Sequence, residues 1–261
     1  MRRGDVAVIS ISTVLAAVVV GAVAFSLLVL DRSPRTTVIG SESASSTWFV
    51  VTWGPALCKV EPTNLGCTSG HVGEMGQTMV LHGLWPQPST NQYCGVPKEI
   101  ADRVRNIHGS DMPSVQLSDA VRTELQSMLS DADVMAPHEW YAHGTCSGVT
   151  PDEYFENASA LTDQARKVLD PMFTEAAGAP MTITRVREKF DAEFGAGAGE
   201  RVGLSCRTVT GEGNVVYEVQ MSLPPVVDIS TGADALSLGD LLLKGPPLSP
   251  QCRHGHVSEA S

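Results

Sequence analysis

The densest group of chemically active side chains in the sequence lies in residues 138–146. This segment reads His-Glu-Trp-Tyr-Ala-His-Gly-Thr-Cys, so that two imidazoles and one carboxylate fall within six residues. The unperturbed pKa of histidine lies closer to neutrality than that of other side chains, which suits it to proton transfer. The segment therefore indicates acid–base chemistry, with His138, Glu139 and His143 as candidate catalytic residues.

A second segment, residues 81–86, reads Leu-His-Gly-Leu-Trp-Pro and adds His82 to this group. Imidazoles with a carboxylate and no metal suit phosphoryl transfer, in which one neutral ring takes a proton from a hydroxyl and one protonated ring gives a proton to the leaving oxygen. RNA supplies that hydroxyl as the 2′-OH beside its own phosphate. A further donor such as His138 would stabilise charge on the phosphate oxygens.

A zinc metalloprotease is the competing class of enzyme. Its signature, His-Glu-x-x-His, places two histidines four residues apart on a helix. Here His138 and His143 are five residues apart, an angular offset of about 140° on an ideal helix, against about 40° for four residues. We therefore expect no metal site, and we expect Glu139 and His143 to share one helical face.

The N-terminal residues 1–30 are predicted to be a signal anchor or a signal peptide. Residues 6–30 carry no charge and are almost wholly apolar, enough to span a hydrocarbon core about 30 Å thick. Arg2 and Arg3 precede them, which places the N-terminus in the cytoplasm and the rest of the chain outside. The small residues 22–24 keep a cleaved signal peptide open as the alternative. The protein is thus expected to be secreted or membrane-anchored.

The rest of the chain is predicted to form one folded domain, residues 48–252, after a flexible linker at residues 31–47 and before a polar tail at residues 253–261. The chain holds 18 basic and 29 acidic residues, a net charge of −11. Proteins that grip nucleic acid through many phosphate contacts are usually basic. The charge excludes a tight nonspecific nucleic-acid binder but allows brief action on nucleic acid in a locally neutral cleft.

Strand and helix signals mix along this domain without regular alternation, which predicts an α+β fold. Strands are predicted at residues 48–53, 78–81, 204–209 and 215–221, the last two as a hairpin. Helices are predicted at residues 119–129, 151–169 and 185–194. The strongest helix start is Thr150-Pro-Asp-Glu, a capping box with proline at the first helical position.

All six cysteines lie in the part of the chain expected outside the cytoplasm, where an even number of cysteines indicates disulfides. They are Cys58, Cys67, Cys94, Cys146, Cys206 and Cys252. The sequence alone allows 15 pairings. A zinc cluster is disfavoured because closely spaced cysteine pairs are missing from the sequence.

The two histidine segments resemble the active-site segments of the ribonuclease T2 family, His-Gly-Leu-Trp-Pro and His-Glu-Trp-x-Lys-His-Gly-Thr-Cys. The first matches at all five defined positions and the second at seven of eight. The resemblance extends over residues 48–252 and implies an antiparallel sheet with packed helices. It also implies the disulfides Cys94–Cys146, Cys206–Cys252 and Cys58–Cys67.

The resemblance further implies a metal-independent endoribonuclease that needs no cofactor. It would cleave single-stranded RNA by 2′-OH attack, through a 2′,3′-cyclic phosphate to a 3′-phosphate, and would not cleave DNA, which lacks that hydroxyl. His143 would be the general base and His82 the general acid. His138 would bind the phosphate, and Glu139 would help to hold the transition state.

Substrate-binding positions follow from the same resemblance. Trp85 and Tyr93 correspond to residues that stack on a base, although core packing explains Trp85 equally well. Gln87 stands where the family often has Asp or Asn, which predicts a different base preference. Ala142 replaces the family lysine, and loss of one such donor typically costs on the order of a hundredfold in rate. A slower enzyme is expected, and a noncatalytic extracytoplasmic binding protein on the same fold remains the alternative. We expect a monomer.

Overall fold

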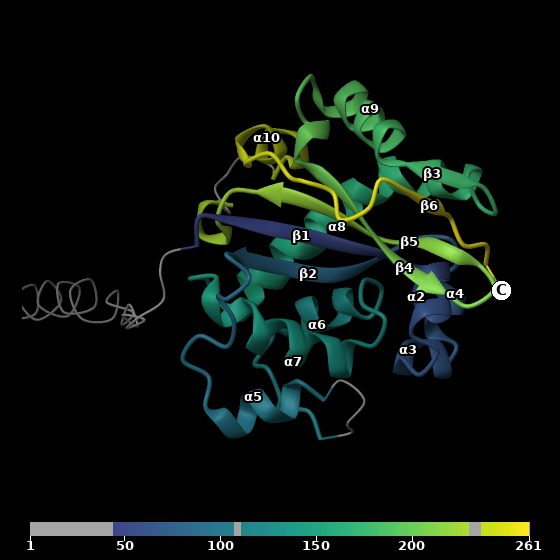
Figure 1. The fold of residues 1–261 in the computed structure, drawn as a ribbon. Helices are drawn as coiled ribbons and strands as arrows, with labels where there is room; N and C mark the ends of the chain where they lie inside the picture. Colours follow the sequence, from purple (N-terminus) through teal and green to yellow (C-terminus); the bar gives the residue numbers. More distant parts are fainter. Residues whose placement is uncertain (1–43, 107–110, 230–235, 261) are drawn as a thin grey trace, which may run out of the picture. The chain divides into compact units, whose positions relative to one another are not determined.

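The fold is built on a six-stranded sheet with helices packed around it (Figure 1). It is seen in a computed structural model that describes residues 44–106, 111–229 and 236–260. The strands are β1 Ser46–Trp53, β2 Met79–Gln87, β3 Pro180–Thr182, β4 Val202–Val209, β5 Gly213–Leu223 and β6 His254–His256. Strand pairing is antiparallel except for one parallel contact between β5 and β6. The predicted α+β class is confirmed.

Helices fill the connections between these strands. They are α2 Gly54–Val60, α3 Leu65–Thr68, α4 His71–Met75, α5 Lys98–Val104, α6 Asp119–Leu125, α7 Ala132–Ala142, α8 Pro151–Glu175, α9 Ile183–Phe194 and α10 Leu238–Lys244. Short 3₁₀ turns lie at Gly144–Cys146, Gly199–Arg201 and Val226–Asp228. Helix α8 crosses behind the sheet in Figure 1, while α5, α6 and α7 lie below β2. Among the described residues, no helix combines the length and apolarity needed to cross a membrane.

Strand β1 lies at the centre of the part of the sheet that carries His82. It pairs with β2 on one side and with β5 on the other. On β2 the register skips one residue, because Val50 faces Gly83 whereas Val51 faces Leu81. His82 is therefore the extra residue of a β-bulge, a local feature that redirects side chains and is common beside active sites.

The outer edge of β2 is covered by side chains from helix α8. The hydroxyl of the buried Tyr154 accepts a hydrogen bond from the Leu84 backbone N–H (3.0 Å) and donates one to the Leu84 carbonyl (2.8 Å). Arg166 Nε donates to the Met79 carbonyl (2.8 Å), and Asp170 accepts from the Met79 N–H (2.8 Å). These hydrogen bonds pair backbone N–H and C=O groups that would otherwise be unpaired at the edge of the sheet. They also fix the strand that carries His82.

Helix α8 begins as predicted and ends later than predicted. Its capping box at Thr150 and Glu153 is present, but the helix continues through Pro171 to Glu175 instead of ending at residue 169. Met172 and Phe173, on the turn after this proline, are buried in the core. Burial of these two side chains favours continuation, because large apolar side chains each contribute about 1.5–3 kcal/mol.

The predicted ends of two other helices also shift. Helix α6 ends at Leu125 rather than at residue 129, while α9 begins at Ile183 because Thr182, not Thr184, caps it. Strand β1 starts at Ser46, inside the predicted linker at residues 31–47. The predicted signal segment at residues 1–30 lies outside the described residues.

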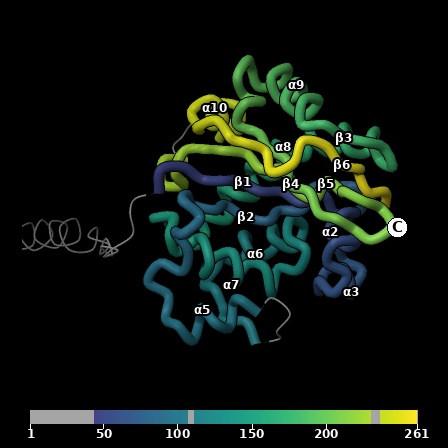
Figure 2. Tube along the Cα trace, viewed as in Figure 1, coloured from purple at the N-terminus to yellow at the C-terminus, as the bar shows by residue number. Residues whose placement is uncertain are grey.

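The prediction of a polar tail at residues 253–261 is wrong for residues 254–258. Residues 254–256 form β6 beside β3 and β5, and this late segment can be followed in yellow along β5 in Figure 2. Val257 and Ser258 are buried, and the Ser258 carbonyl accepts a hydrogen bond from Trp53 Nε1 at 2.9 Å. A three-residue strand is too short to show a periodic pattern, so only the sheet reveals it.

The three predicted disulfides are confirmed. Cys58–Cys67 closes a loop of nine residues, whereas Cys94–Cys146 and Cys206–Cys252 close loops of 52 and 46 residues. The second bridge joins the loop after β2 to the turn after α7. It therefore links the two chain segments that carry the histidines.

Candidate active site

Helix α7 carries His138 and Glu139 but ends before His143. His143 is the C-cap residue, with a non-helical backbone (φ −125°, ψ −48°), and its N–H donates to the Glu139 carbonyl at 3.0 Å. The 3₁₀ turn that follows needs Gly144, because a Cβ there would lie 2.2 Å from the Trp140 ring. This departure from the helix brings the His138 and His143 rings to a centroid distance of 6.4 Å.

The bulge on β2 brings His82 to the same place. Its Nε2 lies 3.8 Å from Glu139 Oε1, and Nε2 of His138 lies 3.9 Å from the same oxygen. Glu139 Oε1 is buried and has no hydrogen-bond partner in the described part of the chain. Two of the predicted catalytic imidazoles, those of His82 and His138, therefore face one oxygen of the fourth predicted residue, Glu139. The His143 ring lies beside them, with its centroid 6.4 Å from that of His138.

The other oxygen of Glu139 is fixed from β2. Trp85 Nε1 donates to Glu139 Oε2 at 3.0 Å. A Cβ on Gly83 would lie only 1.9 Å from that oxygen, so only glycine leaves room for the carboxylate. Trp85 also stacks on His143 (centroids 5.3 Å apart, planes at 29°) and meets His82 edge-on at 4.9 Å. One indole thus positions the carboxylate and both flanking imidazoles.

The environments of His82 and His143 shift their pKa values in opposite directions. Burial by itself lowers the pKa of His82, but the hydrogen bond to Glu218 and the charges of Glu139 and Glu218 outweigh it and raise this pKa to about 9. Burial lowers the pKa of His143 to about 4, with the neighbouring histidines adding to the effect and Glu139 opposing it. At neutral pH, His82 is therefore charged and His143 neutral.

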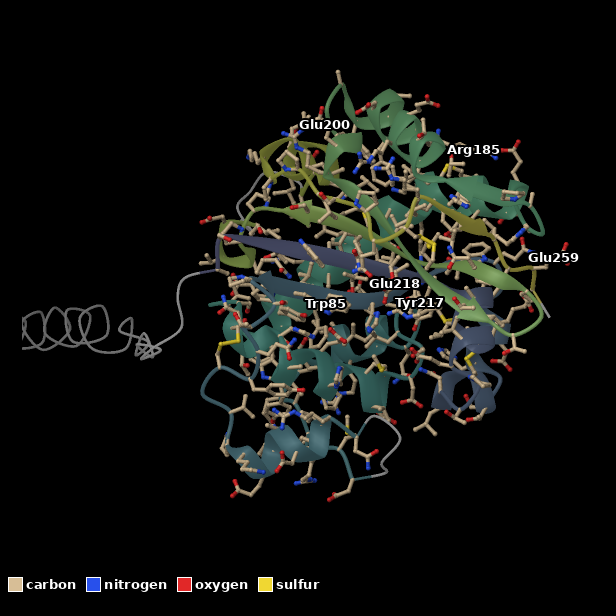
Figure 3. The ribbon with its side chains drawn as sticks, in the orientation of Figure 1. Trp85, Arg185, Glu200, Tyr217, Glu218 and Glu259 are labelled. Carbon is tan, nitrogen blue, oxygen red and sulfur yellow. A yellow bond between two sulfur atoms is a disulfide. The ribbon has the colours of Figure 1, made fainter. Side chains whose placement is uncertain are left out.

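Glu218 is the residue of the site that the sequence analysis missed. It lies on β5 and is 3% exposed, and its Oε1 is 3.0 Å from His82 Nδ1. Figure 3 labels it together with Trp85 and Tyr217 at the middle of the sheet. The sequence does hold a signal that could have identified it, because Glu218 is the only charged residue in the strand of residues 213–223. A carboxylate inside a buried strand requires a partner.

Two cavities open on either side of this group. One, of about 240 Å³, borders His143 and is lined by Trp48, Trp85, Pro86, Gln87, Ser89, Gln92 and His143. The other, of about 60 Å³, borders His82 and His138, with Thr52, Glu61, Asn64 and Tyr217 among its lining residues. The site can therefore receive groups on both sides of the imidazoles.

Two of the three predicted substrate-binding residues line the larger cavity, and the third does not. Trp85 and Gln87 line the larger cavity, where Gln87 Nε2 donates to the Trp85 carbonyl at 3.1 Å. Tyr93 does not line it, and the guanidinium of Arg105 lies 4.4 Å from the centre of its ring. One face of Tyr93 is therefore already covered. Its backbone N–H donates to the Ala142 carbonyl at 2.9 Å, which ties the loop to the end of α7.

Ala142, at the position of the family lysine, is buried (1% exposed) and brings no charge to the site. Within the described part of the chain, Glu139 forms ion pairs with His82 and His138. The positive charge next to this carboxylate thus comes from imidazole. This differs from the lysine that the family motif has at the position of Ala142.

The geometric argument against a metal is wrong, because it assumed an ideal helix through His143. The ligand atoms of His138, Glu139 and His143 lie within 4.8 Å of one another. An ion there would also face the charged His82 across Glu139 Oε1, 3.8 Å from the ring nitrogen. Two positive charges beside one buried carboxylate repel each other, and we assign no metal to these residues.

Comparison with known proteins identifies the family. The sequence model of the Ribonuclease T2 family matches residues 45–233. The chain belongs to the ribonuclease T2 family. The predicted classification as a T2-type endoribonuclease is thereby confirmed, and RNA is the substrate class that the family membership supports.

Individual relatives agree with this assignment. The chain is 30% identical over 166 residues to Ribonuclease MC of Momordica charantia, covering 62% of this chain and 80% of that protein. It is 28% identical over 113 residues to a ribonuclease of Aeromonas hydrophila, covering 43% of this chain and 42% of that protein. The crystal structure of the self-incompatibility-associated SF11-RNase of Nicotiana alata shares the T2 fold, with a TM-score of 0.51 at 15% identity over 82% of this chain and 95% of that one.

Proposed function

We propose that this T2 enzyme cleaves single-stranded RNA by attack of the 2′-OH on the adjacent phosphate, without a metal or other cofactor. The observation that carries the proposal is the arrangement of two imidazoles, His82 and His143, around the one indole that holds the Glu139 carboxylate, in environments that shift their pKa values in opposite directions. His143, with its pKa lowered to about 4, is a base at neutral pH, while His82, with its pKa raised to about 9, is an acid. General acid–base catalysis needs this combination.

The first step then forms one bond and breaks one bond. His143 takes the 2′-OH proton, the 2′-oxygen bonds to phosphorus, and the 5′-oxygen leaves with a proton from His82. The products are a 2′,3′-cyclic phosphate and a free 5′-OH. In a second step water opens the ring to a 3′-phosphate. DNA cannot react because it has no 2′-OH.

His138 is proposed to bind the phosphate. Its Nδ1 lies 2.7 Å from the Val104 carbonyl, which can only accept, so Nδ1 carries a proton. The opposite nitrogen, Nε2, lies 3.9 Å from Glu139 Oε1. When His138 is protonated, this nitrogen donates toward the developing charge on phosphorus, and Glu139 balances the charge of the surrounding rings.

The larger cavity, of about 240 Å³, suits one of the two nucleosides flanking the phosphate. The nucleoside that supplies the 2′-OH would occupy the larger cavity beside His143, against Trp85 and Gln87. Stacking on an aromatic ring contributes about 1–3 kcal/mol per base with little sequence preference. The leaving nucleoside would lie on the His82 side. Tyr93, covered by Arg105, is proposed to act at the rim of the site rather than as a free stacking surface.

We propose that the protein works outside the cytoplasm as a monomer. Its three disulfides are typical of proteins in oxidising compartments. Residues 1–30 would direct export or anchor the chain, residues 31–43 would serve as a linker, and the catalytic domain would extend from β1 through β6.

The test is incubation of the full-length protein with single-stranded RNA in excess EDTA, followed by analysis of the RNA ends. We expect cyclic-phosphate ends that disappear in His143→Ala. A matched control is His71→Ala, a substitution at the start of α4. Activity lost only in EDTA would contradict metal independence. If the wild-type protein leaves the RNA intact, a noncatalytic binding protein would be favoured instead. The observation behind that alternative is Ala142, which replaces the family lysine.

A further inference from the structure

Both ring nitrogens of His82 face a carboxylate, and the two carboxylates come from different parts of the fold. Nδ1 lies 3.0 Å from Glu218 Oε1 on β5, and Nε2 lies 3.8 Å from Glu139 Oε1 on α7. A neutral imidazole has only one N–H and would turn a lone pair toward one of these oxygens. The hydrogen bond at Nδ1 and the second negative charge near Nε2 therefore both favour the doubly protonated ring.

Glu218 is held in place by its own neighbours. The residue before it, Tyr217, is the extra residue of a second β-bulge. Ser205 of β4 faces Glu218 and Cys206 faces Val216, so the register skips Tyr217. Gln220 Nε2 lies 3.4 Å from Glu218 Oε2. Burial alone raises the pKa of Glu218, but the hydrogen bond and charge of His82 outweigh it, with smaller contributions from Arg207 and Ser205, and this pKa is lowered. Glu218 is thus a charged, almost fully buried carboxylate.

The remaining charged groups near His82 favour the same state. Glu61, at the end of α2, adds to the negative field around His82. On the other side of the site, the low pKa of His143 leaves that ring uncharged at neutral pH. Arg207 on β4 acts on Glu218 and lies 5.1 Å from the Tyr217 ring centre.

We propose that Glu218 is a positioning residue for the general acid, which keeps His82 doubly protonated and so makes the enzyme efficient at forming cyclic phosphates and slow at opening them. This proposal rests on the proposed function. Opening the ring reverses the roles of the first step: water must lose a proton to a neutral His82, and the 2′-oxygen must take a proton from a charged His143. Atoms and charges balance, but the enzyme has to be in the opposite protonation state.

That opposite state is rare at neutral pH. With a pKa of about 9, about one His82 ring in a hundred is neutral at pH 7. With a pKa of about 4, about one His143 ring in a thousand is charged. The product of these fractions is about 10⁻⁵, and the joint population is somewhat higher because a neutral His82 no longer lowers the pKa of His143. Removing the Glu218 charge increases the neutral fraction of His82 and therefore raises the second rate relative to the first.

The experiment compares Glu218→Gln with Glu212→Gln, which removes the same charge from the turn of the same hairpin, where Glu212 pairs with Lys59 at 2.9 Å. The pKa of His82 is measured by NMR in the full-length protein. Cleavage of RNA and hydrolysis of a nucleoside 2′,3′-cyclic phosphate are measured across pH 5–10. We expect Glu218→Gln to lower the pKa of His82 by at least about one unit and to raise the ratio of hydrolysis to cyclisation at pH 7 by about tenfold. Glu212→Gln should change neither.

A wild-type His82 that titrates near its ordinary pKa would overturn the proposal, whether or not RNA is cleaved. This NMR measurement needs no variant, so it remains decisive if Glu218→Gln does not fold. A rate ratio that is the same in Glu218→Gln and in the wild-type protein would overturn it as well. Failure of the wild type to cleave RNA would instead contradict the proposed function, which keeps the two outcomes distinct.

Discussion

Substitution of Gly83 by alanine tests how the site holds its carboxylate. The new Cβ would lie 1.9 Å from Glu139 Oε2 and 2.8 Å from Glu139 Cδ. Ordinary contact begins at 3.4 Å, so the oxygen would have to move by about 1.5 Å. Such a shift breaks the 3.0 Å hydrogen bond from Trp85 Nε1. It also carries Glu139 away from His82 and His138.

The expected loss follows from that hydrogen bond. A hydrogen bond to a charged group contributes about 1.5–3 kcal/mol. If this is lost in the transition state, kcat/KM for RNA cleavage falls by about ten- to a hundredfold. The control is Gly73→Ala in helix α4, where a Cβ would meet no atom within 4 Å. This control should keep the wild-type rate.

A double-mutant cycle shows whether the effect acts through Glu139. In Glu139→Ala, the two atoms that Gly83→Ala would strike are gone, and the nearest remaining atom is Trp85 Nε1 at 3.0 Å. The second substitution should then cost much less than it does in the wild type, because the two residues share one interaction. A wild-type rate in Gly83→Ala, or fully additive losses in the cycle, would refute the reasoning.

Three other perturbations act on the pKa values, the disulfide and the missing lysine. The folded-state pKa of His143 lies below the usual histidine pKa, so we expect the free energy of unfolding to fall by about 3 kcal/mol as the pH drops from 6.5 to 4. The folded-state pKa of His82 lies above the usual value, so we expect a similar loss as the pH rises from 6.5 to 9. Urea unfolding across pH checks both limbs, and His143→Ala should lack the acid one. Replacing Cys94 and Cys146 together by serine should cost about 4 kcal/mol and reduce cleavage, as measured by thermal unfolding and RNA assay. Ala142→Lys should raise kcat by up to about a hundredfold, and an unchanged kcat would count against a missing cation at that position.

The residues to which we assign the chemistry could be proposed from the order of amino acids alone. The two histidine segments identified His82, His138, Glu139 and His143, and the structure brings these four residues together at one site. Local signals were equally informative for the capping box of α8 and for the β4–β5 hairpin. These features depend on neighbouring residues, so the sequence pattern is sufficient to find them.

The charge and orientation of those residues depend on the folded chain. The bulge that turns His82 toward Glu139 exists only because β2 pairs with β1 at a shifted register. Glu218 is 136 residues from His82 and reaches it across the sheet. The short strand β6 likewise gains its role from its neighbours β3 and β5. A pKa depends on burial and on charges distant in sequence, and residue types along the chain do not contain that information until the chain has folded.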